Sequence, residues 1–136
     1  AEIKITDELR AEAKDVIIVS YSNGLHMSLQ AAKILKEQHG IDACVMDLRQ
    51  LKPLAWDVIK TTLSPFDKIL VVDECRAWGG VSDHLIAQLV QTPEFSKKTF
   101  ACVKAHDTYV PLGPAAHAVL PQVSDIVKQC CNLIKP

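Results

Sequence analysis

The chain has 136 residues and a formal net charge of −1, and 49% of its residues are hydrophobic and 23% charged. This length and composition are typical of one globular domain. The balanced charge argues against nucleic acid and anionic membranes as partners, because both attract strongly basic proteins. No apolar stretch approaches the roughly 20 residues of a membrane helix. The first residues also lack the apolar region of a signal peptide.

The five cysteines have neither the spacing of a zinc site nor that of a disulfide framework. Four of them lie in apolar strand-like or helix-like runs: Cys44, Cys102, Cys130 and Cys131. We therefore expect buried, reduced thiols in a reducing compartment, and no metal site. Cys75 stands beside Arg76, whose positive charge favours a thiolate. No histidine base lies near Cys75 in the sequence, which argues against a catalytic nucleophile.

Strand-like and helix-like segments alternate along the chain. Residues 1–14 are charged and carry no core pattern, so we expect a linker or an edge segment there, followed by one domain over residues 15–136. Apolar runs predict strands at residues 16–20, 43–48, 68–73 and 99–104. Apolar residues at helical spacing predict helices from the turn at 21–24 to about residue 39, from 55 to 63, from 81 to Pro93, and from 121 onward. This alternation predicts an α/β protein whose helices cover both faces of a mainly parallel sheet.

Turn-forming residues bound the first predicted helix. Ser22 or Asn23 can cap its N-terminus with a side-chain oxygen. Gly40 fits the left-handed position that ends many helices. The apolar residues of this helix recur at helical spacing: Leu25, Leu29, Ala32 and Leu35.

The turn after the first strand also has a functional interpretation. Ser22-Asn23-Gly24 contains one glycine, whereas a dinucleotide-binding turn needs three, so the sequence gives little support to nucleotide binding. The amides of the following helix N-terminus can still attract an anion. His26 lies in the first turn of that helix, either as a solvated surface side chain or as a catalytic residue.

Charged residues and glycines follow the third predicted strand. Its apolar run stops at Asp73, Glu74 and Arg76 come next, and Gly79-Gly80 opens a helix. In open α/β sheets, ligands and partners bind just beyond the carboxyl ends of the strands. Glu74 and Arg76 therefore form either a salt-bridged pair or part of a substrate clamp.

Two other strand ends carry polar residues. Asp47 and Arg49 close the second strand, and the same two interpretations apply to them. Asp107 follows the fourth strand and is typical of a turn that its side chain stabilises. His106 and His117 are possible ligands, but no paired carboxylate or cysteine supports them. The sequence thus predicts a functional edge of the sheet without a complete active site.

Four segments together resemble the C-terminal domain of the transketolase-like proteins. They are Val16–Tyr21 with Gly24, His26 and Ala31-Ala32; Asp47–Leu54; Val71–Gly80; and Asp107–Pro111 with Leu120-Pro121 and Asp125–Val127. The second segment, D-L-R-Q-L-K-P-L, is similar to the family pattern D-L-R-x-L-x-P-L and is the most specific. The resemblance covers about residues 15–134 and is closest to the beta subunit of the thiamin-dependent decarboxylating component of 2-oxo acid dehydrogenases, of the pyruvate, branched-chain or acetoin type. Transketolases and deoxyxylulose phosphate synthases fit the D-L-R segment less well.

This resemblance implies a three-layer α/β/α fold with about five strands, mostly parallel, and one antiparallel edge strand. It implies that thiamin diphosphate serves the parent enzyme but is bound by other domains, so we expect no catalytic, cofactor-binding or metal residues in this chain. The implied partners are the alpha subunit, a second beta subunit and a lipoyl acyltransferase, in a homo-oligomer of the cytoplasm or the mitochondrial matrix. The isolated chain is expected to be catalytically inert.

The sequence departs from the family pattern ahead of the fourth strand. Lys97 and Lys98 stand where the family often has an acidic residue, which inverts the local charge. Because like charges across an interface weaken binding, this argues against the usual acyltransferase docking by that route.

The alternative function is a free-standing module that binds an anion or a small acid. Such a module would use helix amides and arginines at the strand ends. The pocket would be formed by four residues: Gly24, Gly80, Arg49 and Arg76.

Overall fold

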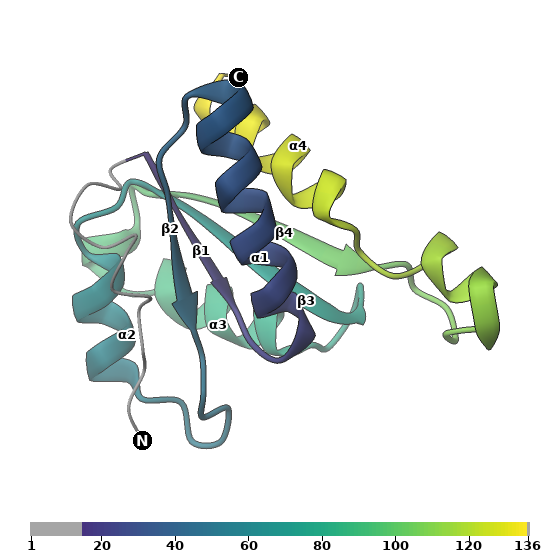
Figure 1. Ribbon diagram of the computed structural model, residues 1–136. Helices are drawn as coiled ribbons and strands as arrows, with labels where there is room; N and C mark the ends of the chain where they lie inside the picture. The colour runs from purple at the N-terminus through teal and green to yellow at the C-terminus, as the bar shows by residue number, and fades with distance from the viewer. Residues whose placement is uncertain (1–14, 136) are drawn as a thin grey trace.

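Four parallel strands form the central sheet of the computed structural model, which describes residues 15–135 (Figure 1). The strands are β1 (Val16–Ser20), β2 (Ala43–Asp47), β3 (Lys68–Arg76) and β4 (Thr99–Ala105). They lie in the order β2–β1–β3–β4, so β1 and β3 are the central strands. The predicted linker over residues 1–14 lies outside the described residues.

Four α-helices connect or follow the strands, as the sequence predicted. They are α1 (Asn23–Ile34), α2 (Trp56–Leu63), α3 (Val81–Val90) and α4 (Val123–Ile134). Three shorter helical segments accompany them: η2 (Leu35–His39), η3 (Pro93–Phe95) and η4 (Gly113–Ala118). None of the helices in the described part is long and apolar enough to cross a membrane.

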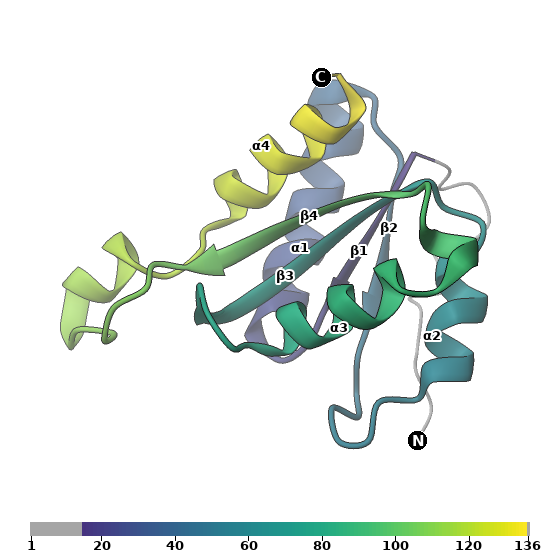
Figure 2. The same ribbon diagram turned by 180° about the vertical axis from the view of Figure 1, so that it is seen from behind.

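The helices cover both faces of the sheet, which confirms the predicted three layers. α1 and α4 pack on one face, and α2 and α3 on the other (Figures 1 and 2). Side chains of β1 alternate between the two cores, since Val16 and Ile18 lie in the first and Ile17 and Val19 in the second. All five residues of β1 are buried. An uninterrupted apolar run is what a strand covered on both faces requires.

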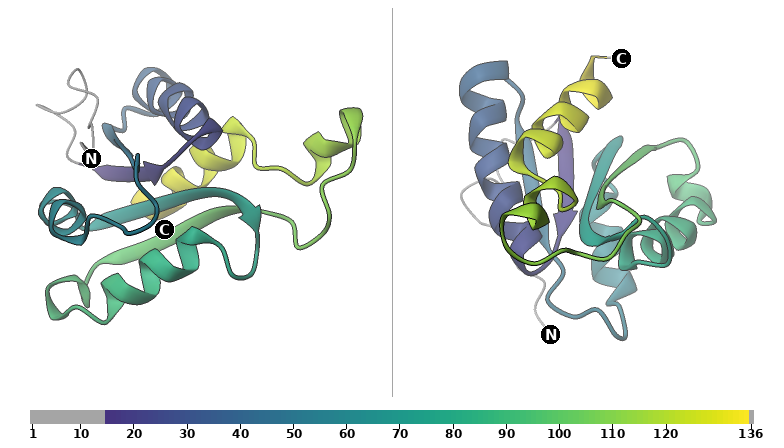
Figure 3. Two further views of the ribbon diagram at one scale, coloured as in Figure 1. Left: turned by 90° about the horizontal axis from the view of Figure 1, so that it is seen from below. Right: turned by 90° about the vertical axis from the view of Figure 1, so that its right-hand side faces the viewer.

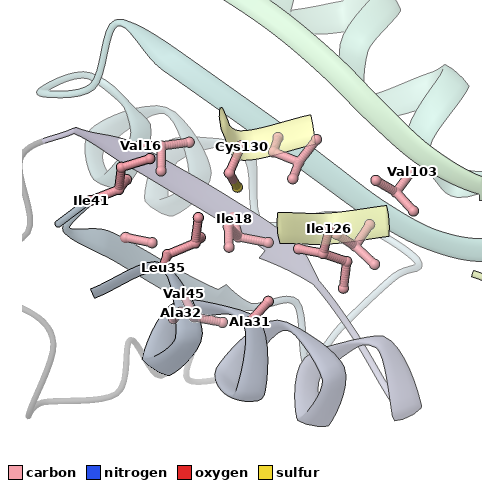
Figure 4. Packing of buried hydrophobic residues seen from close by; sticks show 13 residues of the cluster. Val16, Ile18, Ala31, Ala32, Leu35, Ile41, Val45, Val103, Ile126 and Cys130 are labelled. Atoms are coloured by element: carbon pink, nitrogen blue, oxygen red, sulfur yellow. The ribbon is translucent and has the colours of Figure 1, made fainter. Parts of the chain in front are cut away.

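The core under α1 and α4 combines small and branched side chains (Figure 4). α1 approaches the sheet closely because its buried residues are small: Gly24, Ser28, Ala31 and Ala32. The predicted apolar positions Leu25 and Leu29 are only half-buried and pack at the margin of this core. From α4, Ile126 and Cys130 are fully buried against it.

The sheet differs from the expectation in its number and direction of strands. Within residues 15–135 it has four strands, all parallel, instead of about five with one antiparallel edge strand. A helix lies between each pair of successive strands, and helical crossovers return the chain in the same direction. β3 is also longer than predicted, because a register shift after Asp73 lets pairing with β4 continue to Arg76.

The two ends of the first helical segment test the predicted caps. Gly40 has φ 64° and ψ 24°, so the left-handed stop is confirmed, although five residues of η2 separate it from α1. The predicted side-chain cap at the other end is wrong. Ser22 occupies the N-cap position with φ 52° and ψ −132° and makes no side-chain capping bond, and Asn23 is the first residue of α1. This backbone conformation is costly for a residue with a side chain.

After β4 the chain leaves the sheet as a projecting arm, residues 106–119 (Figure 3). The backbone amide of His106 donates to the Val119 carbonyl at 2.9 Å, and this bond joins the two ends of the arm. The arm contains η4 and returns to the body just before α4 (Figures 1 and 3). The sequence predicted neither a strand nor a helix in this stretch, and the structure adds the short helix η4 to it.

Candidate functional site

The carboxyl ends of all four strands meet at one edge of the sheet, here called the strand-end edge. Asp47 closes β2 and pairs in register with Ser20, the last residue of β1. Glu74 lies near the end of β3, and Asp107 follows β4 by two residues. The parallel sheet therefore places the predicted acidic residues at a common edge.

A buried carboxylate that the sequence did not single out as a site residue organises this edge. Asp73 has no exposed surface, and its two oxygens accept three hydrogen bonds. Tyr21 Oη donates to Oδ1 at 2.6 Å, the Cys75 amide donates to the same oxygen at 3.0 Å, and the Ser82 amide donates to Oδ2 at 2.9 Å. Asp73 thus ties the ends of β1, β3 and α3 together.

The hydrogen bonds also decide the charge state of this network. Burial by itself raises the pKa of Asp73, but donation from Tyr21 and from the amides of Ser82 and Cys75 outweighs burial and holds the pKa below its ordinary value. Burial, and then the bond to Asp73, raises the pKa of the Tyr21 phenol. Asp73 is therefore an anion and Tyr21 a neutral donor at neutral pH.

Two of the predicted site glycines serve close packing at this edge. A Cβ at Gly24 would collide with Ser20 Oγ, which donates to the Val72 carbonyl at 2.8 Å. A Cβ at Gly80 would lie 2.6 Å from Asp73 Oδ2. Each glycine brings a helix N-terminus against a strand end, and the space that a ligand would need is filled by the chain itself.

The N-terminus of α3 is occupied by carboxylates of this chain. The Gly79 amide donates to Asp83 Oδ2 at 2.7 Å, and the Ser82 amide donates to Asp73. Lys104 Nζ bonds Asp83 and also donates to the Ala77 carbonyl at 3.0 Å. Its ammonium group and the Gly79 amide hold the pKa of Asp83 below its usual value. The amides of Gly79 and Ser82 are therefore already paired and are not available to an external anion.

These features do not fit the diphosphate group of a thiamin cofactor. A diphosphate needs unpaired amides and a divalent cation. At α3 the amides of Gly79 and Ser82 are paired, and the buried carboxylate of Asp73 would repel an anion. Among residues 15–135, no group of three or more His, Cys, Asp or Glu side chains is arranged to hold a metal ion.

The predicted charged pairs behave differently from one another. Arg49 Nε lies 3.2 Å from Asp47 Oδ2, which is the ion pair proposed for these two residues. Glu74 does not pair with Arg76. Instead, its carboxylate accepts a hydrogen bond from Asn23 Nδ2 at 2.7 Å, which joins the N-terminus of α1 to the end of β3.

Other predicted residues lie outside the Asp73 network. His26, His106 and His117 are exposed, on α1 and on the arm. Arg76 and Asp107 are exposed too, and the described structure gives neither side chain an ion pair or a hydrogen bond.

Two of the cysteine environments are informative. Cys75, which is not one of the four cysteines in apolar runs, is exposed, with its sulfur 3.6 Å from Tyr21 Oη. Cys130 is buried beneath α4, and burial, followed by the neighbouring Cys131, raises its pKa to about 12. Cys130 is thus an inert core thiol, as predicted.

The two lysines ahead of β4 also differ. Lys98 Nζ donates to the carbonyls of Ser64 and Phe66, both at 2.7 Å, and lies 5.4 Å from the centre of the Phe95 ring. Its charge therefore holds the α2–β3 turn against η3, while Lys97 is exposed. Both lysines precede β4, at the end of the sheet opposite the strand-end edge.

The sequence interpretation missed the exposed apolar side chains at the strand-end edge. Trp78 is 77% exposed, Tyr109 89%, Val110 52% and Leu112 96%, more than any other large apolar side chain that is described. Trp78 follows β3, and the other three lie on the arm. The sequence did hold a signal for this exposure, because these large apolar residues stand in Gly- or Pro-containing segments that follow strands.

Comparison with known proteins gives the family. The family model described as transketolase, C-terminal domain, matches residues 7–126. The pyruvate dehydrogenase E1 component subunit beta of Chaetosphaeridium globosum is 29% identical over 94% of this chain and 40% of its own length. The protein of the same name from Bacillus subtilis is 30% identical over 94% of this chain and 39% of its own length. The chain therefore spans about two fifths of these relatives.

The fold is shared with solved structures as well. A structure described as a split gene transketolase, inactive beta4 tetramer, has a TM-score of 0.75 and 24% identity, and the similarity covers 90% of this chain and 39% of that one. The parallel sheet and its helical layers are consistent with the family match over residues 7–126. This chain belongs to the family of transketolase C-terminal domains.

Proposed function

We propose that the chain acts as the C-terminal domain of a thiamin diphosphate-dependent 2-oxo acid dehydrogenase, in the beta subunit of its decarboxylating component. Support comes from the family match over residues 7–126 and from relatives named pyruvate dehydrogenase E1 component subunit beta. The parent enzyme would decarboxylate a 2-oxo acid and pass the acyl group to lipoamide. The family match is the observation that carries this proposal.

Within that enzyme, the domain would contribute subunit contacts and docking of the acyltransferase, and other domains would bind the cofactor. The strand-end edge supports this division of labour. At this edge, amides at the N-terminus of α3 donate to Asp73 and Asp83, and the glycines pack closely against Ser20 and Asp73. The exposed part of the edge is apolar. The same engagement of amides at α3 disfavours the free-standing anion-binding module.

The partners would be the alpha subunit, a second beta subunit and a lipoyl acyltransferase. Docking of the acyltransferase ahead of β4 would have to accommodate the exposed charge of Lys97, since the charge of Lys98 is directed into the fold. Such an enzyme would work in the cytoplasm, or in the mitochondrial matrix of a eukaryote.

Calorimetric titration with thiamin diphosphate and Mg²⁺ tests this proposal on the isolated chain. We expect no saturable heat, because the amides of Gly79 and Ser82 at α3 are already paired and the described residues hold no group of metal ligands. A full-length pyruvate dehydrogenase E1 of known cofactor binding is the positive control. Saturable binding by the 136-residue chain at micromolar concentrations would contradict the proposal.

A further inference from the structure

A groove runs between the end of α1, with η2, and α4, which lie side by side on one face of the sheet (Figures 1 and 3). It encloses a cavity of about 560 Å³. Pockets that hold small molecules have volumes of roughly 300–1,000 Å³, and the space between neighbouring helices is a common place for them. The groove therefore has the size and the position of a ligand site.

α4 supplies an apolar floor to this groove. Val123, Val127 and Cys131, here called the α4 stripe, recur every four residues and so lie on one face of the helix. Each is half-buried at the margin of the core. The stripe spans two helical turns, about 12 Å. Ile34, the last residue of α1, lines the same groove. An aliphatic chain in the groove would thus contact apolar side chains.

The helical turn η2 brings polar residues to the groove. In an α-helix, the fifth residue after Ile34 would lie about 140° around the axis from it. η2 is a π-helical turn, and its hydrogen bonds join residues five positions apart, which returns His39 toward the side of Ile34. Gln38 and His39 accordingly line the groove with Ile34. Turns of this kind are rare and are frequently found at functional sites.

The rim of the groove carries a cation and hydrogen-bond donors. Lys128 on α4 and His39 on η2 are exposed, and neither side chain has an ion-pair or hydrogen-bond partner within residues 15–135. Gln38 and Asn132 add amide donors. No Asp or Glu among the described residues lines the groove. An apolar floor below such a rim is complementary to a molecule with an aliphatic part and an anionic head.

We propose that this groove binds a carboxylic acid with an aliphatic tail, whose tail lies on the α4 stripe and whose carboxylate is held by Lys128 and His39. The small apolar floor favours a small molecule over a docked protein, because a stable protein interface buries about 800 Å² on each partner. The groove is separate from the Asp73 network, so the inference goes beyond the proposed function. The titration with thiamin diphosphate and the tests below can therefore fail independently of each other.

Calorimetric titration of the 136-residue chain with decanoate, kept below its micelle concentration, tests the site. We expect saturable binding, about tenfold or more tighter than that of decylamine, which has the same tail and the opposite charge. Lys128→Glu should weaken decanoate binding about tenfold or more, because the carboxylate then meets a like charge. Lys97→Glu makes the same change at an exposed position outside the groove, and salt screening should keep its effect within about twofold.

Two cysteines give a second readout that locates the ligand. Cys131 lines the groove, whereas Cys75 is exposed beyond it, next to Tyr21. Bound decanoate should slow the alkylation of Cys131 by iodoacetamide, followed by mass spectrometry, and leave the rate at Cys75 unchanged. An unaltered thermal midpoint of Lys128→Glu in the absence of decanoate separates loss of binding from loss of fold.

Four results would each overturn the inference. They are the absence of saturable decanoate binding, equal affinities for decanoate and decylamine, equal losses from Lys128→Glu and Lys97→Glu, and equal protection of the two cysteines. Binding of an acidic amphipathic helical peptide by a chain that does not bind decanoate would also overturn it, and would assign the groove to a protein partner.

Discussion

Asp73 is the residue on which the strand-end edge depends. A fully buried carboxylate is costly unless donors surround it, and here a phenol and two amides from three chain segments do so. Tyr21 and Asp73 are separated by 52 positions in the sequence, and no local pattern predicts that they meet. The sequence showed only that an acid ends an apolar strand, and burial of that acid became apparent in the fold.

Tyr21→Phe tests the phenol's contribution. The change removes the donor to Asp73 Oδ1 and leaves the ring in place. We expect the free energy of unfolding to fall by about 1.5–3 kcal/mol, the range for a hydrogen bond to a charged group. Urea unfolding followed by circular dichroism measures it. Tyr109→Phe removes a phenol that is 89% exposed and should cost little. Equal effects from the two variants would show that the bond to Asp73 contributes nothing special.

The lowered pKa of Asp73 predicts how stability depends on pH. Its carboxyl titrates at lower pH in the folded chain than in the unfolded chain, where the pKa is about 3.9. Its contribution is therefore complete above about pH 5 and is lost as the pH falls through 4 and below. Asp73→Asn should flatten the decline of the unfolding free energy between about pH 5 and pH 3.

Urea titrations at several pH values measure that decline. Asp57→Asn, which changes an exposed carboxylate on α2, is the matched control, and its curve should follow that of the unmodified chain. If Asp73→Asn shows the same steep loss below pH 4 as the control, other carboxylates carry the acid sensitivity.

Gly80→Ala tests the close approach of α3 to β3. The added methyl group would lie 2.6 Å from Asp73 Oδ2, and that oxygen is fixed by the Ser82 amide. Overpacking of this kind costs about 1–3 kcal/mol, and alanine is also less favourable than glycine at the N-cap position that Gly80 occupies. The double variant Gly80→Ala/Asp73→Asn reveals whether the two changes are coupled, since neighbouring sites do not add. If the losses of unfolding free energy in the two single variants add up to the loss in the double variant, the added methyl group does not act through Asp73.

At the scale of elements, the hydrophobic pattern was sufficient for the alternation of strands and helices. β1 was recognised because an unbroken β-branched run can only be covered on both faces. The buried face of α1 was less predictable. The helix packs closely on the sheet because Gly24 and Ser28 have little side-chain volume, whereas the hydrophobic pattern pointed to Leu25 and Leu29 as the buried residues. The end of β3 was missed because its register shift depends on pairing with β4.

The N-terminus of α4 offers a test at this scale. The Gln122 amide donates to Asp125 Oδ2 at 2.8 Å, as part of a capping box at the end of the arm. Asp125→Ala should destabilise the chain by about 0.5–2 kcal/mol. Ser124→Ala, one position earlier and exposed, is the matched control for the same unfolding measurement. Comparable losses from both would mean that the capping bond does not secure α4.

At the scale of the whole molecule, the parallel sheet gathers the ends of four strands at a single edge, and this edge has two parts. The inner part is closed by Asp73, Asp83 and their donors, and the outer part carries exposed apolar side chains, among them Trp78, Tyr109 and Leu112. The position of the strand-end edge was predictable from strand order alone. The sequence could not show that the inner part is fully hydrogen-bonded and the outer part apolar and exposed, because the exposure of Trp78 and Leu112 depends on the three-dimensional fold.

Hydrogen–deuterium exchange of the chain at low and high concentration tests directly whether the outer part of this edge is a protein-contact surface. The account predicts that amide exchange slows at high concentration in peptides that cover residues 76–80 and 106–112. Peptides from α1 and α4 should exchange equally at both concentrations. Slowing confined to α1 and α4, or no change anywhere, would contradict it.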